Sequence, residues 1–157
     1  MKTGFHIHTA ETQEDFELGK MLFQEYVHSL NIDLSFQNFT QELESINDQY
    51  NKPNGALILA FHGTTAIGCS GLRKLDQETA ELKRVYVKSK YRGHHLGTAL
   101  LQNSIEQARK LNYKKIRLDT LKDMLRAHQL YHSFGFYKIP AYKSNPLPGT
   151  LYMEKLL

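Results

Sequence analysis

LKRVYVKSKYRGHHLGTALL, residues 82–101, puts an apolar strand, a basic turn and a helix in direct succession. The strand ends near Val87, and apolar residues recur at helical spacing from about Leu96 onward. Gly93 and Gly97 allow the backbone here to approach a ligand closely. The basic and imidazole side chains of the turn are Lys88, Lys90, Arg92, His94 and His95. Because the first amides of a helix lack intrahelical partners and carry positive potential, this arrangement predicts a site for an anion such as phosphate.

Two familiar phosphate-binding motifs do not describe this turn. It has neither the GxxxxGK[ST] pattern of the P-loop nor the GxGxxG pattern of dinucleotide-binding folds. A solvated basic turn with no ligand is the simpler alternative. The direct succession of strand, basic loop and helix favours the anion site over that alternative.

The totals predict one globular domain. The chain has 157 residues, which suits a single core, and 41% of them are hydrophobic and 23% charged. Its longest apolar run, Ala56–Phe61, is far shorter than the roughly 20 residues of a membrane-spanning helix. The N-terminal sequence has no apolar segment of the signal-peptide kind. We therefore expect a cytoplasmic protein that does not enter a membrane.

The net charge and the cysteine and histidine content limit the classes of ligand that the sequence predicts. The net charge of +4 suits an anionic partner. Cys69 is the one cysteine, so no intrachain disulfide can form, and we expect a small buried thiol. His128 and His132 are four residues apart on a predicted helix, but no third ligand is evident, and we expect no metal site.

Periodicity predicts an α/β protein with a mixed sheet. Strands are expected at 5–9, 56–62, 65–74, 79–88, 115–120, 136–139 and 151–156. A first helix is expected at 13–29, with Thr12 as its cap, and a second after Ser35, with Phe39, Leu43 and Ile46 on one face. Two more helices are expected at 97–111 and at 124–134. The order is β-α-α-β-β-β-α-β-α-β-β. In the fourth strand, alternation puts Glu81, Lys83, Val85 and Val87 on one face and Leu82, Arg84 and Tyr86 on the other.

The segment that follows the fourth strand resembles motif A of the GCN5-related N-acetyltransferases (GNAT), Arg/Gln-x-x-Gly-x-Gly/Ala. Arg92 matches its first position and Gly97 its last, whereas His95 stands at the middle glycine. That departure indicates a position that needs no positive φ, or a slightly different loop. Downstream, AHQLYHSFGF is similar to the family pattern A-x-x-L-Y-x-x-x-G-F, and PLPGTLYMEKLL resembles its closing strand. The resemblance implies that residues 1–157 form a single GNAT-like domain, whose sheet is splayed between strands four and five.

For the cofactor, the resemblance implies acetyl-coenzyme A (acetyl-CoA) and no metal. In the family, the fourth strand pairs with the pantetheine arm through its backbone, which assigns this role to Val85, Tyr86 and Val87. An amide of Tyr86 or Val87 would also meet the oxyanion. The pyrophosphate would rest on the loop and helix start, at Arg92, Gly93, His94, His95, Leu96, Gly97 and Thr98.

The implied reaction is acetyl transfer to an amine, which needs two proton transfers. An alkyl ammonium with a pKa of about 10.4 must lose a proton, and the departing thiolate must gain one. The resemblance puts Tyr131 near the sulfur as proton donor, with a core aromatic as the alternative. Glu81 matches the general base of the histone-acetylating branch. An ion pair of Glu81 with Lys83 or Arg73 is an equally weighted alternative.

A second departure from the family lies before the tyrosine helix. Met124 stands seven residues before Tyr131, where many members carry an asparagine that contacts the cofactor. That contact is either absent here or made by a neighbour such as Arg126.

The sequence leaves the acceptor open. In the family, specificity comes from the first two helices and from the loop between the last strands, here about 26–50 and 140–149. Arg73 and Arg84 could bind the carboxylate of an amino-acid-like acceptor, or they could face solvent. Protein, polyamine, antibiotic and small-metabolite acceptors all stay open, and so does a homodimer.

Two functions from other classes compete with the enzyme. A non-catalytic acyl-CoA sensor would bind the same cofactor without turnover. A nucleic-acid-binding module would use the basic cluster Lys83, Arg84, Lys88, Lys90 and Arg92, with Tyr86 and Tyr91 interleaved. The phosphates of coenzyme A explain the same cluster more economically, so the sequence favours coenzyme A over nucleic acid as the ligand.

Overall fold

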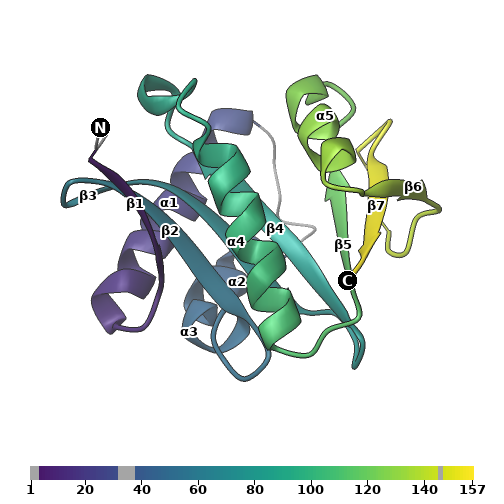
Figure 1. Ribbon diagram of the computed structural model, residues 1–157, viewed down its shortest axis with the longest axis horizontal. Helices are drawn as coiled ribbons and strands as arrows, with labels where there is room; N and C mark the ends of the chain where they lie inside the picture. The colour runs from purple at the N-terminus through teal and green to yellow at the C-terminus, as the bar shows by residue number, and fades with distance from the viewer. Residues whose placement is uncertain (1–3, 32–37, 145–146) are drawn as a thin grey trace.

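The computed structural model describes residues 4–31, 38–144 and 147–157, which form a seven-stranded mixed sheet with helices on both faces (Figure 1). The sheet order is β1-β2-β3-β4-β5-β7-β6. The strands are β1 (Phe5–Thr9), β2 (Ala56–His62), β3 (Thr65–Lys74), β4 (Thr79–Val87), β5 (Lys115–Thr120), β6 (Tyr137–Ile139) and β7 (Leu151–Leu156). The helices are α1 (Gln13–Leu30), α2 (Phe39–Glu44), α3 (Ile46–Gln49), the short 3-10 helix η2 (Ser89–Tyr91), α4 (Leu96–Lys110) and α5 (Leu125–Ser133). The predicted α/β class with a mixed sheet and the predicted order of the strands along the chain are confirmed.

Strand β2 shows how the sheet divides the core. Ile58 and Ala60 pack with α4, whereas Leu57 and Leu59 pack with α1 and α3 on the opposite face. All four side chains are almost fully buried, so β2 is a central strand with two apolar faces. Among the described residues, no helix is both long and apolar enough to cross a membrane.

The first helix begins after its predicted capping residue, whereas the second helix differs from the prediction. The Asp15 amide donates to Thr12 Oγ1 at 3.1 Å, and the Thr12 amide donates to Asp15 Oδ2 at 3.2 Å, so Thr12 is the predicted cap. The prediction of a single second helix was wrong, because α2 and α3 are separated at Ser45, whose φ of −108° and ψ of 20° are not helical. Ser35, its expected cap, lies outside the described residues, and α2 follows Asn38 instead.

A bulge in β4 changes the faces on which its side chains lie. Gly71 pairs with Lys83, but Cys69 pairs with Tyr86, so β4 contains one extra residue at this point. Arg84 absorbs it with a φ of +59°. The prediction that side chains alternate regularly between the two faces along the whole of β4 was therefore wrong. Arg84 lies on the same side as Lys83, toward α1 and α2, and Val85 turns toward the α4 core.

Strands β4 and β5 pair over only a short length. Their parallel register runs from Thr79–Lys115 to Glu81–Arg117, and the described residues show no further pair between them. Strand β5 continues to Thr120 in register with β7. The sheet therefore opens between β4 and β5 beyond Glu81, as the predicted splay requires.

Candidate active site

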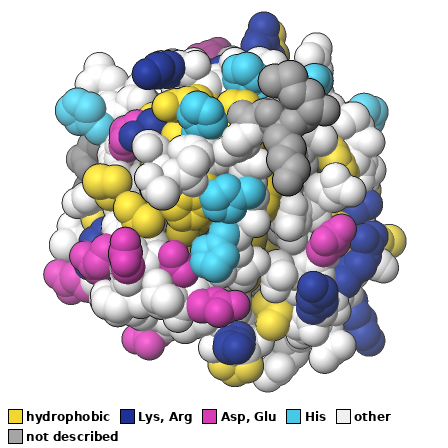
Figure 2. Space-filling view, turned by 60° about the vertical axis from the view of Figure 1, so that its left-hand side comes forward, with side chains coloured by type: hydrophobic (Ala, Val, Ile, Leu, Met, Phe, Trp, Pro, Cys, Tyr) yellow, Lys and Arg dark blue, Asp and Glu magenta, His cyan; other side chains and the backbone are white. Residues whose placement is uncertain are grey.

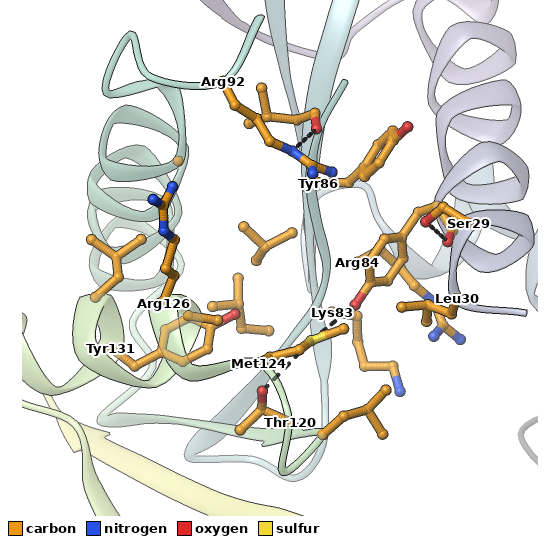
Figure 3. A pocket seen from close by; sticks show the side chains of 18 of the residues that line it. Ser29, Leu30, Lys83, Arg84, Tyr86, Arg92, Thr120, Met124, Arg126 and Tyr131 are labelled. Atoms are coloured by element: carbon orange, nitrogen blue, oxygen red, sulfur yellow. Dashed lines mark hydrogen bonds between the residues drawn. The ribbon is translucent and has the colours of Figure 1, made fainter. Parts of the chain in front are cut away.

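A cavity of about 690 Å³ lies where β4 and β5 part (Figure 3). This volume is within the range of small-molecule sites in proteins. Its walls come from β4, the turn after it, the start of α4, the end of β5, α5 and the C-terminal end of α1. Most of the predicted cofactor residues line it: Val85, Tyr86, Val87, Arg92, Gly93, His95, Leu96, Gly97, Thr98 and Tyr131.

The start of α4 is an open anion site at one end of this cavity. Within the described chain, His95 is the N-cap residue and no side chain caps the helix. The first intrahelical bond is that of the Ala99 amide to the His95 carbonyl, at 3.1 Å. The amides before it, including that of Gly97, therefore have no intrahelical acceptor, and the first turn carries no acidic residue. A phosphate would find unpaired donors and no competing carboxylate here.

The conformation of His95 corrects one expectation from the sequence. Its φ is +60°, so the position does use the left-handed region, although it is not glycine. Gly93 has a φ of +89° and open space where a Cβ would lie, which shows that backbone conformation, rather than crowding, favours glycine there. The loop therefore keeps a glycine-like conformation at His95 at some cost in strain.

Arg92 closes the loop onto the end of β4. Its Nε donates to the Val87 carbonyl at 3.0 Å, and its side chain is otherwise exposed. In Figure 3 the Arg92 and Arg126 guanidinium groups lie along the upper part of the pocket. Arg126 lines the cavity, as Met124 does, so it can add positive charge near the position that lacks the family's asparagine. Met124 Sδ is 4.0 Å from the hydroxyls of Tyr26 and Thr120.

His94 points away from this cavity. Its ring lies 5.0 Å from the Phe5 ring, and it lines a separate hollow of about 390 Å³ between β1 and the loop. Histidine side chains are visible on the face of the molecule that carries β1 (Figure 2). Any contact of His94 with a cofactor would come from its backbone amide, and that role stays a prediction.

Tyr131 lines the cavity from α5 and is 8% exposed. Its ring packs 5.7 Å from that of Phe136, and Figure 3 shows it directed into the pocket. Burial raises the pKa of Tyr131, so its hydroxyl stays protonated at neutral pH. The ring therefore packs in the core while the residue lines the cavity, and the role of its hydroxyl as a proton donor stays a prediction.

Glu81 lies outside the cavity lining, in a buried ion cluster. Its carboxylate accepts hydrogen bonds from Arg73 Nε at 3.1 Å, the Tyr142 hydroxyl at 2.7 Å and Lys143 Nζ at 2.7 Å. Burial alone would raise its pKa, but the charges of Lys83, Lys143 and Arg73 outweigh burial and lower it to about 2. A carboxylate with so low a pKa is a weak base. These contacts favour the structural ion pair with Arg73 over the proton-accepting role.

Three charged residues at the other end of the cavity were not selected from the sequence as a binding set. They are Lys83 and Arg84 on β4 and Asp119 on β5. Lys83 and Arg84 are 4% and 7% exposed, although both belong to the basic cluster considered for nucleic acid. That cluster is therefore not one surface. The bulge at Arg84, which brings it to the side of Lys83, leaves no signal in the residue pattern.

Other sequence expectations about single residues are resolved by burial and contacts. Cys69 is fully buried, and burial raises the pKa of its thiol, as expected of a structural cysteine. Arg73, on β3, does not line the cavity, and its guanidinium donates to Glu81 and Gln49. Arg84 does line it, with its guanidinium bonded to Glu42 at 2.8 and 3.1 Å.

Known proteins share this architecture. The family model described as "Acetyltransferase (GNAT) family" matches residues 20–136, which is most of the chain. The chain belongs to the GNAT acetyltransferase family. An uncharacterized N-acetyltransferase of Schizosaccharomyces pombe is 38% identical over 151 residues, covering 94% of this chain and 92% of that protein. This GNAT chain also shares its fold with solved acetyltransferases.

Two such structures are an acetyltransferase from Streptococcus agalactiae and a GNAT family acetyltransferase from Elizabethkingia anophelis with acetyl-CoA bound. The first has a TM-score of 0.79 at 24% identity and covers 99% of this chain and 100% of that one. The second has a TM-score of 0.65 at 24% identity with the same coverage.

Proposed function

We propose that this GNAT enzyme transfers the acetyl group of acetyl-CoA to a primary amine of a small molecule or a protein. The observation that carries the proposal is the cavity between β4 and β5, which ends on the uncapped start of α4. A related fold with acetyl-CoA bound, the Elizabethkingia protein, supports the choice of cofactor. The lone buried thiol of Cys69 suits a reducing compartment and supports a cytoplasmic site of action.

The cofactor would lie along β4, with its diphosphate at α4. The amides of Leu96, Gly97 and Thr98 would bind the phosphates, with Arg92 and Arg126 adding positive charge. Beyond Glu81, strand β4 has an edge from which β5 has parted, and the pantetheine arm would pair with that edge at Val85–Val87.

The chemistry at the inner end of the cavity is a displacement at the thioester carbonyl. The amine nitrogen forms a bond to the carbonyl carbon while the carbon–sulfur bond breaks, and the nitrogen releases its proton to solvent. An amide of Tyr86 or Val87 would stabilise the oxyanion, and one such donor is worth about 3 kcal/mol. Tyr131 would protonate the departing thiolate and then regain a proton from solvent, so that no net proton stays on the enzyme.

Glu81 takes a different role in this proposal from the one expected of it. Because its carboxylate is bonded to Arg73, Tyr142 and Lys143, we assign it to holding the ion cluster behind the cavity. Among the described residues that line the cavity, Asp119 is the acidic one. It is therefore the carboxylate best placed to attract the ammonium group of an acceptor.

Thermal unfolding with and without acetyl-CoA tests cofactor binding. A ligand at 100 times its dissociation constant adds about 2.7 kcal/mol of stability, which is an easily measured shift. An amine panel, monitored for the free thiol of coenzyme A, then tests turnover. A shift without thiol release from any amine would favour a non-catalytic sensor, and the absence of a shift at millimolar acetyl-CoA would refute the proposal.

A further inference from the structure

An ion pair lines the end of the cavity away from the predicted phosphate site. Lys83 Nζ lies 4.0 Å from Asp119 Oδ1, and both residues line the cavity. Their side chains are 3% and 9% exposed, so both charges are shielded from bulk water. In Figure 3 the side chain of Lys83 lies on the Thr120 side of the pocket, opposite Arg92. This pair offers one positive and one negative group to whatever molecule enters beside the thioester.

The pair belongs to a larger ion network. Salt bridges connect seven described residues through contacts of 2.7 to 4.0 Å. The basic members are Arg73, Lys83, Arg84 and Lys143, and the acidic members are Glu42, Glu81 and Asp119. The described network thus has one more basic group than acidic groups, and it can accept an added carboxylate without an excess of negative charge. Burying a charge is costly unless it is paired, so a carboxylate would be favourable here.

The ionisation of Lys83 agrees with this geometry. Burial and the charge of Arg84 lower the pKa of Lys83 to about 7, although Glu81 and Asp119 act in the opposite direction. A positive charge at Lys83 is therefore costly before a ligand binds. A carboxylate beside Nζ would favour the charged form and would bind through a charge-assisted hydrogen bond.

We propose that the acetyl acceptor is a small amino acid, whose carboxylate binds Lys83 and whose ammonium group binds Asp119. The proposal rests on the acetyltransferase function proposed above. An amino acid carries its two charged groups on the same or neighbouring carbons, and the Lys83–Asp119 pair presents the complementary charges 4.0 Å apart. Tyr26 and Met124 border the same space, where they would contact the acceptor side chain.

Matched acceptors test the proposal on the wild-type enzyme. Alanine, serine and histidine are each compared with their carboxamides, which keep the amine and the size but lose the negative charge. We expect kcat/KM at least about tenfold higher for the acids, since tenfold corresponds to about 1.4 kcal/mol. Propionate, which is alanine without its amine, is expected to compete with the acceptor but not with acetyl-CoA. Carboxamides that react as well as the acids, or an absence of inhibition by propionate, would overturn the proposal.

Variants of the pair identify the residue. Lys83→Met should reduce the ratio of kcat/KM for the acids to kcat/KM for their carboxamides to about one, while Lys83→Arg should retain the preference. Lys74→Met, on the exposed end of β3, is the matched control. Equal losses for acids and carboxamides would overturn the assignment to Lys83. Turnover of amines without any preference for a carboxylate would refute this inference alone, whereas no turnover of any amine would refute the proposed function as well.

Discussion

Replacing Glu81 with glutamine removes one negative charge from a buried cluster while keeping the shape of the side chain. Glu81 is 1% exposed and bonds to Arg73, Tyr142 and Lys143 at 2.7 to 3.1 Å. Its pKa is lowered from 4.5 to about 2, a difference that corresponds to about 3 kcal/mol of stability at neutral pH. Breaking a buried ion pair from one side costs about 3–5 kcal/mol in other proteins. We therefore expect Glu81→Gln to destabilise the fold by about 3 kcal/mol.

The assay is thermal unfolding, read together with turnover. In a protein of this size, about 3 kcal/mol corresponds to a fall in Tm of roughly 6–12 °C. Glu78→Gln is the matched control, because the Glu78–Lys114 pair at 3.1 Å is exposed on both sides and such pairs contribute roughly 0–1 kcal/mol.

The pH dependence of the difference has a definite sign. Because the folded-state pKa of Glu81 is depressed, its contribution is fully present above about pH 4.5 and is lost as the pH falls toward 2. Wild type and Glu81→Gln should therefore converge in stability on acidification. The folded variant should keep the acidic limb of the wild-type pH–rate profile, because Glu81 is not the proton acceptor in this proposal. If Glu81→Gln had the same Tm as the control variant but lost activity because the acidic limb of its pH–rate profile changed, the structural assignment would be wrong and Glu81 would be the base.

Three further substitutions test the site and the core. Tyr131→Phe should lower kcat, measured by steady-state kinetics, on the order of 100-fold. The dissociation constant for coenzyme A, measured by calorimetry, should not change. Turnover equal to that of the wild type would remove Tyr131 from the mechanism. His95→Gly should keep Tm or raise it, because glycine relieves the strain of a φ of +60°, whereas His95→Val should lower it; the reverse order in thermal unfolding would refute the strain. Gly71→Ala should cost about 1–3 kcal/mol in urea unfolding, since the added Cβ would lie 2.6 Å from Tyr50 Cε1, and an unchanged midpoint would contradict that packing.

Much of the fold follows from local patterns. The strands around Ala56–Lys74 and the helix after Gly93 have strong apolar periods, so their predicted bounds agree with the structure to within a residue or two. The capping pair of Thr12 and Asp15 is likewise a local signal. By contrast, the break at Ser45 lies inside a continuous helical pattern, where tertiary packing of Ile46 and Tyr50 decides the geometry.

The site was predictable where backbone chemistry defines it and was missed where side-chain pairing defines it. Glycines and basic residues mark the turn around Arg92–Gly97, and the structure brings Arg92, Gly93, His95 and Gly97 to one cavity. The pair of Lys83 and Asp119 joins two strands across the splay, and neither position looks unusual in a half-polar strand. The surroundings of Glu81 depend on Lys143, which is 62 residues away in the sequence. Such long-range pairing has no period that a single sequence could reveal.

The uncapped amides at the start of α4 are predicted to bind the diphosphate of coenzyme A. An amide NMR titration with coenzyme A measures this directly, one residue at a time. The amide signals of Gly93, Leu96, Gly97 and Thr98 should move most and saturate together, while those of Gly55 and Gly71 stay in place. If coenzyme A bound and left the four loop and helix signals unchanged, the phosphates would lie elsewhere and the predicted phosphate site at α4 would be wrong.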